Sequence, residues 1–169
     1  MSRSRTLLVA GLLLAWSSAH GDGAARYDTS HSGLVVDSRQ QLVWMRCSLG
    51  QLFHDGHCLG EAERLHLSDA EARVDALATA DCPWRLPRFF ELRGLMQPGD
   101  DRGMAIDSMA FPDTPSGWYW NQVTAGGHSQ QDCFVDFAGE GRTRCNMAGQ
   151  FYLRPVMSLG EAAAHCLAP

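Results

Sequence analysis

Two short segments rich in aromatic residues and proline constrain most strongly what this chain can fold into. Residues 84–92 read Trp-Arg-Leu-Pro-Arg-Phe-Phe-Glu-Leu, and residues 111–120 read Phe-Pro-Asp-Thr-Pro-Ser-Gly-Trp-Tyr-Trp. Proline fixes its own backbone angle and restricts the residue before it, so each segment predicts a stiff turn that leads into a regular element. Neither segment holds an acid–base pair, an activated nucleophile or a metal-ligand spacing. We therefore expect a scaffold with a recognition surface and not an enzyme.

The N-terminus reads as a secretory signal peptide over residues 1–19. Two arginines precede an apolar run, and small residues ending at Ala19 match a signal-peptidase site. The run is shorter than the roughly 20 apolar residues that cross a bilayer, so cleavage is expected rather than an uncleaved membrane anchor. Residues 20–169 are expected to form one domain, with its core over about 27–156, in the periplasm or outside the cell.

The charge of the chain limits its partners. The formal net charge is −5, and every basic residue is an arginine. Removal of the signal peptide takes away arginines but no acidic residue, so the mature chain is more acidic still. Because phosphate contacts need a basic face, nucleic acid is not an expected partner. No membrane span is expected after the signal is removed.

The sequence holds six cysteines, and an even number in an exported chain predicts disulfides. Sequence alone leaves many pairings open. Our prediction pairs Cys47 with Cys58 and Cys133 with Cys145 as local staples, and Cys82 with Cys166 as a long closure. The alternative is a zinc site, but the sequence has no Cys-x-x-Cys pair and no histidine spacing typical of a zinc finger.

The first half of the mature chain predicts a hairpin and a helix. Apolar runs at 34–37 and 42–45 flank a short polar link and predict a β-hairpin, whereas the Gly- and His-containing stretch at 47–60 predicts a loop. Residues 67–80 predict a helix, with Ser68-Asp69-Ala70-Glu71 as its capping box.

A second, shorter helix is expected to begin at Pro87, because the missing N–H of proline costs nothing in a first turn. Trp84, Arg85 and Glu91 are interpreted with Pro87 as structural residues. Arg85 is expected to pair with an acid such as Glu91 or with a backbone carbonyl.

The second half predicts a long ordered loop over 102–117 and then strands. The expected strands are 118–123, 133–137, 142–146 and 151–156, with a glycine turn at 139–141. A hairpin, two helices and a run of antiparallel strands together define an α+β fold.

Several of these segments, taken in order, are similar to a known family. Residues 34–46, 84–92, 111–120, 135–137 and 152–156 resemble the C-terminal domain of Legionella collagen-like protein. Members read as a Gly-Leu-x-Trp hairpin, Trp-Arg-Leu-Pro-x-x-x-Glu-Leu, Phe-Pro-x-Thr-Pro-Ser-x-x-Tyr-Trp, a Val-Asp-Phe strand and a closing aromatic-x-Arg-x-Val strand. The resemblance implies a C-type-lectin-like fold and export. It also implies the binding of sulfated polysaccharide that the best-known member, an adhesin, shows.

The expected ligand-binding residues lie in the late strands. They are Trp118, Tyr119, Trp120, Asn121, Arg142 and Arg144. Three consecutive aromatic residues alternate faces in a strand, so one face is core and the other could stack on a sugar ring. Arg142 and Arg144 point the same way, and with Arg154 they predict a basic stripe for sulfate or carboxylate, or a solvated face without a ligand. A glycan or a cell-envelope protein is the expected partner.

No cofactor is expected for the binding domain itself, although calcium is possible in the long loop. Four aspartates lie in or near the long loop: Asp100, Asp101, Asp107 and Asp113. Calcium takes several oxygen ligands from such loops, although aspartate also favours turns without any metal.

Two enzymatic alternatives also remain open. Formylglycine-generating enzymes have a lectin-like fold and an Arg-Leu-Pro helix entry with a downstream glutamate, but they need a reactive cysteine pair. His20, as a new N-terminus, could bind copper together with a second histidine, although the glycine-rich residues after it are expected to fray.

Overall fold

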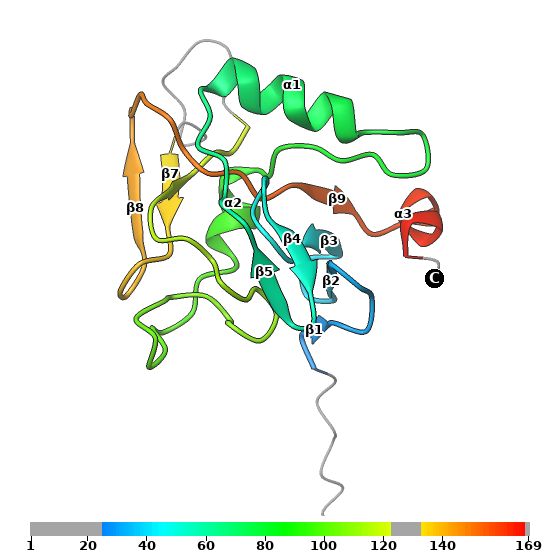
Figure 1. Cartoon of the computed structure of the whole chain (residues 1–169), viewed down its shortest axis with the longest axis horizontal. Helices are drawn as coiled ribbons and strands as arrows, with labels where there is room; N and C mark the ends of the chain where they lie inside the picture. The colour runs from blue at the N-terminus through cyan, green and yellow to red at the C-terminus, as the bar shows by residue number, and fades with distance from the viewer. Residues whose placement is uncertain (1–24, 123–132, 168–169) are drawn as a thin grey trace, which may run out of the picture.

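The computed structural model describes residues 25–122 and 133–167 (Figure 1). The predicted signal peptide at 1–19 and the predicted N-terminal His20 lie outside these residues. The described chain forms an α+β fold, as predicted, and its strands make three antiparallel sheets. Its likeness to C-type lectins stays a prediction.

The largest sheet is built around the predicted hairpin. Its strands, in spatial order, are β1 (Tyr27–Asp28), β2 (Leu34–Asp37), β3 (Leu42–Met45) and β9 (Val156–Ser158). Strand β3 is central and buried on both faces, with Trp44 in one core cluster and Val43 in the other. The closing strand was predicted at 151–156 but forms at β9. Only isolated bridges occur earlier, at Phe151 and Tyr152.

A second, two-stranded sheet corrects the loop predicted at 47–60. It consists of β4 (Leu52–His54) and β5 (His57–Leu59), joined through Asp55 and Gly56. Both turn residues have positive φ, 46° and 84°, which matches a two-residue hairpin turn. The Asp-Gly pair was therefore a hairpin signal that the loop prediction overlooked.

Helix α1 (Leu67–Leu77) has the predicted position but different ends. His66 is the N-cap and no side chain caps the helix, so the predicted capping box is wrong: Ser68 lies inside the first turn. The helix ends at Leu77 and not at residue 80. Ala70 and Val74 form its buried stripe against the core.

Helix α2 (Phe89–Arg93) is a short helix with Arg88 as its N-cap. Pro87 therefore precedes the cap instead of opening the first turn. The Glu91 carboxylate accepts a hydrogen bond from the Arg88 N–H at 2.7 Å and pairs with Arg85 through two bonds of 2.8 Å. The Arg85 backbone in turn exchanges hydrogen bonds with Val156. The Trp-Arg-Leu-Pro segment thus fastens helix α2 to the main sheet.

The third sheet carries most of the predicted binding residues. Its strands, in spatial order, are β6 (Trp118–Tyr119), β7 (Cys133–Asp136) and β8 (Arg142–Cys145). The predicted glycine turn joins β7 and β8, and Gly141 has a φ of +76°, where an added Cβ would collide with the Met96 side chain. Strand β6 ends at Tyr119, well short of the predicted end at residue 123, which lies outside the described residues.

Three disulfides join the cysteines, and the predicted pairing is confirmed. Cys47 bonds to Cys58, Cys133 to Cys145 and Cys82 to Cys166. The last one ties the chain after α1 to α3 (Glu161–Cys166), a helix that the sequence did not predict. Each disulfide therefore fixes a different part of the fold.

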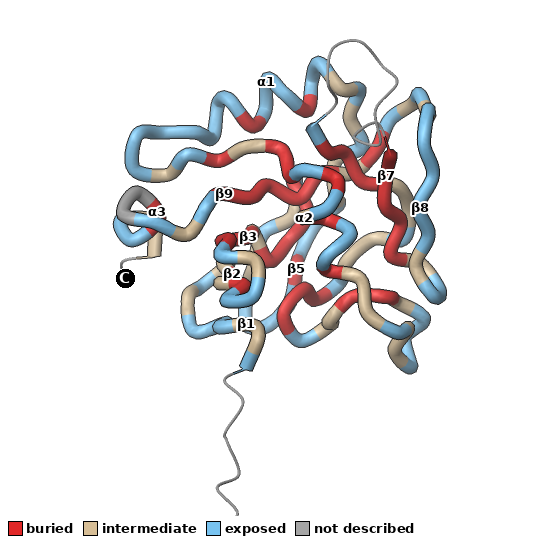
Figure 2. Tube along the Cα trace, turned by 180° about the vertical axis from the view of Figure 1, so that it is seen from behind, coloured by how far each residue is buried: buried red, intermediate tan, exposed pale blue. Residues whose placement is uncertain are grey.

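Strand β7 lies between the two core clusters. Val135 points into the cluster that contains Trp44 and Tyr119, and Phe134 points into the cluster that contains Trp120. Strand β8 is instead exposed along its whole length (Figure 2). The third sheet therefore has a buried middle strand and an exposed outer strand.

Candidate binding surface

The structure corrects the predicted aromatic platform. Tyr119 is 0% exposed, Trp120 is 4% exposed and Asn121 is 0% exposed. The alternation of faces is present, but core covers both sides, because Tyr119 joins one cluster and Trp120 the other. Only Trp118, which is partly exposed, can still contact a ligand.

The three buried side chains hold the loop and strands in place. The Tyr119 hydroxyl lies 2.8 Å from Ser48 Oγ and the indole N–H of Trp120 donates to the Leu65 carbonyl at 2.7 Å. The Asn121 amide donates to the carbonyl of Cys133. All three bonds join β6 and the residues after it to other parts of the chain, so these residues are structural.

Trp118, Asp136 and Arg142 form a row across the third sheet. Trp118 is in register with Asp136, and Asp136 with Arg142, so the three side chains share one face. The Arg142 guanidinium pairs with Asp136 and lies 5.5 Å from the centre of the Trp118 ring. Asp136 is itself fixed by the N–H groups of Gly117 and Ala138, at 3.1 and 2.9 Å. Arg142 is therefore held in position over an aromatic ring.

Arg144 lies on the same face, two residues further along β8. It is exposed, and it makes no ion pair with any other residue of the described chain. Arg144 lies on β8, which is the outer strand of its sheet, so it is accessible to a ligand. We call Trp118, Arg142 and Arg144 together the arginine face.

Arg154 does not belong to this stripe. It is 0% exposed and donates to the carbonyls of Met45 and Arg46 and to the hydroxyl of Thr114. Burial lowers its pKa. Arg154 therefore anchors the loop that begins at Phe111. The sequence pattern did not distinguish this structural arginine from the exposed ones.

The four aspartates proposed for calcium do not form one site. Asp100 accepts the N–H groups of Arg102 and Met104, and Asp107 accepts those of Met109 and Ala110, so each closes a local turn. Within residues 25–122 and 133–167, no three His, Cys, Asp or Glu side chains gather in a way that could hold a metal ion.

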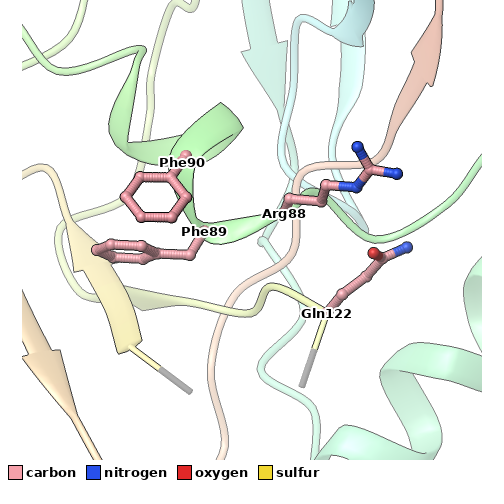
Figure 3. A pocket seen from close by; sticks show the side chains of 4 residues that line it. All are labelled: Arg88, Phe89, Phe90 and Gln122. Atoms are coloured by element: carbon pink, nitrogen blue, oxygen red, sulfur yellow. The ribbon is translucent and has the colours of Figure 1, made fainter. Parts of the chain in front are cut away.

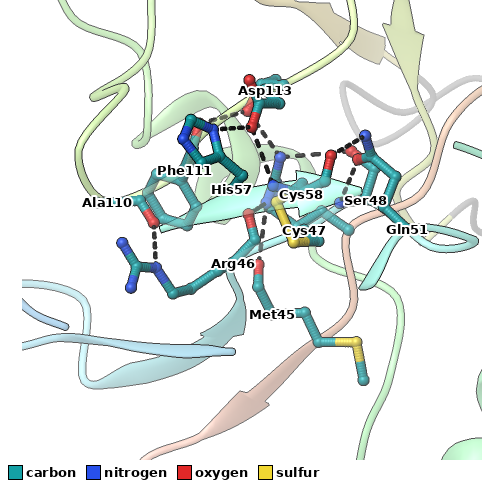
Figure 4. Close-up of a disulfide and its surroundings, with 12 residues drawn as sticks. Met45, Arg46, Cys47, Ser48, Gln51, His57, Cys58, Ala110, Phe111 and Asp113 are labelled. Carbon is teal, nitrogen blue, oxygen red and sulfur yellow. Dashed lines mark hydrogen bonds and ion pairs between the residues drawn. A yellow bond between two sulfur atoms is a disulfide. The ribbon is translucent and has the colours of Figure 1, made fainter. Parts of the chain in front are cut away.

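Asp113 has a different partner, the β4–β5 hairpin (Figure 4). Its carboxylate accepts the N–H of Cys58 at 2.9 Å and lies 3.3 Å from His57 Nδ1. The hairpin is thereby held from two directions, by Asp113 and by the Cys47–Cys58 disulfide. This aspartate therefore braces a disulfide-bonded hairpin.

A small pocket between α2 and the end of β6 was not predicted. It is lined by Arg88, Phe89, Phe90 and Gln122 (Figure 3). The polar ends of Arg88 and Gln122 lie on one side and the two rings on the other. The Phe-Phe pair could have indicated it, because adjacent residues in a helix point in different directions and only Phe89 is buried.

These observations define a class of protein. It is an α+β domain held by disulfides, in which an exposed strand presents two arginines next to a tryptophan. A family model, the Lcl C-terminal domain, matches residues 33–157, and the chain belongs to this family. Searches of curated proteins and of solved structures returned no match. Membership of the family indicates a secreted binding domain.

The disulfides bear on location. Three disulfides are consistent with an extracellular or secreted protein, because such bonds persist in oxidising compartments. No helix within the described part of the chain has both the length and the apolar character that a membrane crossing requires.

Proposed function

We propose that this domain is an exported, non-catalytic module that binds an anionic glycan through the arginine face. The observation that carries the proposal is the position of Arg142, fixed by Asp136 and laid over Trp118, with Arg144 beside it. Guanidinium groups bind sulfate and carboxylate through paired hydrogen bonds, and an indole edge offers apolar contact to a sugar ring.

The disulfides support binding over oxidase chemistry. All six cysteines are engaged in them, whereas an enzyme of the formylglycine-generating type needs a reactive pair. The overall acidity of the chain makes the proposal more specific. The full sequence has a formal charge of −5 and the exported domain is more acidic still, so it gains little from general attraction to polyanions. Recognition has to come from a local arrangement of arginines.

The test compares one polysaccharide in its sulfated and desulfated forms. The exported protein is titrated with each by calorimetry, as wild type and as Arg142→Ala/Arg144→Ala. We expect binding to the sulfated form that falls at least tenfold in the double variant and weakens with salt. The control is Arg93→Ala/Arg102→Ala, which removes the same charge from exposed positions elsewhere. Equal losses of affinity for the sulfated polysaccharide in both double variants would contradict a binding site at the arginine face.

A protein partner is the second candidate, and one observation favours it. Leu52 and Leu59 are directly paired across the β4–β5 hairpin and are 77% and 52% exposed. Apolar side chains grouped on a rigid hairpin are typical of protein contacts. Crosslinking in the cell envelope tests this function: it predicts a stable partner that Leu52→Ser/Leu59→Ser abolishes, together with no affinity for any polysaccharide.

A further inference from the structure

A second cavity, of about 280 Å³, lies beside the first strand. Three stretches of chain that are far apart in sequence meet there: the start of β1, the residue that follows Met96, and the turn before Phe111. The residues that shape it are Arg26, Tyr27, Thr29, Gln97, Asp107 and Met109. The cavity shares no residue with the arginine face.

Several hydrogen-bonding groups that line this cavity have no hydrogen-bond partner within the described chain. The Asp107 Oδ1 atom accepts the N–H groups of the following turn, at 2.9 and 3.0 Å, and no described residue donates to Oδ2. The side chains of Gln97 and Thr29 make no hydrogen bonds within the described chain. Arg26 uses Nε and Nη2 on Asp37 and the Gly94 carbonyl, which leaves Nη1. Free donors and free acceptors therefore line the same cavity.

The charge of the cavity selects against anions. Arg26 pairs with Asp37 at 2.6 Å, so its positive charge is already compensated. Asp107 has no ion pair among the described residues and remains as a net negative group at the wall. A ligand that carries sulfate or carboxylate would meet this carboxylate, which raises the energy of the complex.

Apolar surface completes the cavity. The Tyr27 ring packs edge-on against Phe111, with ring centres 5.4 Å apart. Met109, at the rim, is 79% exposed. An apolar wall with a few convergent polar groups is the usual composition of a small-molecule site.

From these groups we infer that the cavity binds one neutral sugar unit. Each sugar hydroxyl both donates and accepts, so a vicinal pair can bridge a carboxylate oxygen and an amide or guanidinium N–H, as Asp107, Gln97 and Arg26 offer. The C–H face of the ring then lies against Tyr27 or Met109. This inference goes beyond the proposed function, because its ligand carries no charge and its residues are different.

The test uses saturation-transfer NMR and calorimetry on the exported protein. The probes are the methyl glycosides of glucose, galactose and mannose, with methyl glucuronide as the anionic counterpart. We expect at least one neutral glycoside to bind with a dissociation constant on the order of 1 mM, as a ligand of this size allows. The glucuronide should bind at least tenfold more weakly than the corresponding glucoside.

Two variants locate the site. Gln97→Ala and Asp107→Asn should each weaken the binding of the neutral glycoside at least fivefold. The amide that replaces the carboxylate in Asp107→Asn keeps an oxygen that can close the turn, so the melting temperature should stay at its wild-type value. The matched control is Gln122→Ala, which removes an exposed amide from the other pocket and should leave binding unchanged.

The outcomes separate this inference from the proposed function. Arg142→Ala/Arg144→Ala should keep full affinity for the neutral glycoside. Loss of binding in Gln122→Ala but not in Gln97→Ala would overturn the inference, and so would preference for the glucuronide. It is also overturned if no neutral glycoside binds at about 10 mM, tenfold above the expected dissociation constant.

Discussion

Arg154 donates a hydrogen bond to the hydroxyl of Thr114 at 2.9 Å, and this bond joins a fully buried guanidinium to a loop forty residues earlier in the chain. The same guanidinium donates to the carbonyls of Met45 and Arg46 at the end of β3. Within the described chain its hydrogen-bond partners are carbonyl and hydroxyl oxygens, and no carboxylate pairs with it. One side chain thus holds the long loop against the main sheet.

The substitution Arg154→Lys should destabilise the domain by about 2–4 kcal/mol, because a compact ammonium cannot reach acceptors that a planar fork reaches together. Thr114→Val removes a single acceptor and should cost about 1 kcal/mol. Urea unfolding of the oxidised protein measures both. If Arg154→Lys lowered the free energy of unfolding no more than Thr114→Val does, the planar fork of the guanidinium would not be the cause of the stabilisation.

The Arg85–Glu91 pair predicts a pH dependence of stability. Burial raises the pKa of Glu91, but the hydrogen bonds from Arg85 and from the Arg88 N–H outweigh it, and the net pKa is lowered. A carboxyl with a lowered folded-state pKa stabilises the fold above its unfolded pKa, near 4.3, and this contribution is lost as the pH falls through the folded-state pKa.

The variant Glu91→Gln should therefore lose about 1–2 kcal/mol at pH 7, because two charge-assisted hydrogen bonds to Arg85 are weakened. The gap between wild type and variant should narrow as the pH drops below about 4. Thermal unfolding from pH 3 to pH 7 follows this gap. Glu140→Gln, at an exposed turn position, is the control and should melt like the wild type at every pH. A gap that stays constant with pH would contradict the stated role of the ion pair.

Local patterns in the sequence predicted the local parts of this fold. The β2–β3 hairpin follows from two apolar runs around a polar link, and the position of α1 follows from its periodic apolar residues. The Asp55-Gly56 turn carried an equally local signal for the β4–β5 hairpin. What these features share is that neighbouring residues alone determine them.

The candidate site was harder to predict, because it depends on which faces other segments cover. Alternation places Trp118 and Trp120 on one side of a strand, but only the fold shows that Trp120 packs against Phe134 and Phe151 while Trp118 stays partly exposed. In the same way, Arg154 and Arg144 look alike in sequence, and only tertiary contacts bury one and expose the other.

Two tyrosines give a matched test of buried hydroxyl groups. The Tyr27 hydroxyl is buried and has no hydrogen-bond partner in the described chain, and burial raises its pKa. The Tyr119 hydroxyl contacts Ser48 Oγ at 2.8 Å and donates to the Pro115 carbonyl at 3.3 Å. Removing an unpaired hydroxyl relieves a desolvation cost, whereas removing a paired one leaves its partners unsatisfied.

Tyr27→Phe should therefore leave the free energy of unfolding unchanged or raise it by up to about 1 kcal/mol. Tyr119→Phe should lower it by about 1–2 kcal/mol. Each change deletes one oxygen atom and keeps the ring, so the core cluster that both rings join stays filled. Chemical denaturation of the two variants side by side measures both free energies of unfolding. An equal decrease in Tyr27→Phe and Tyr119→Phe would mean that the Tyr27 hydroxyl does have a hydrogen-bond partner.

The three disulfides should contribute unequally to stability, because they close loops of different length. Cys82–Cys166 spans 84 residues, whereas Cys133–Cys145 spans 12. On the chain-entropy account a closed loop of the first size stabilises by about 4.5 kcal/mol and one of the second size by about 3 kcal/mol. Cys82→Ser/Cys166→Ser should then lower the unfolding free energy more than Cys133→Ser/Cys145→Ser, as measured by denaturant unfolding without reductant.

A larger loss in Cys133→Ser/Cys145→Ser would contradict the chain-entropy account. It would show that the Cys133–Cys145 disulfide stabilises the fold through its position between β7 and β8, beneath the arginine face. In that case the Cys133→Ser/Cys145→Ser variant should also lose affinity for the anionic glycan, since β8 would no longer be held to the buried strand beside it.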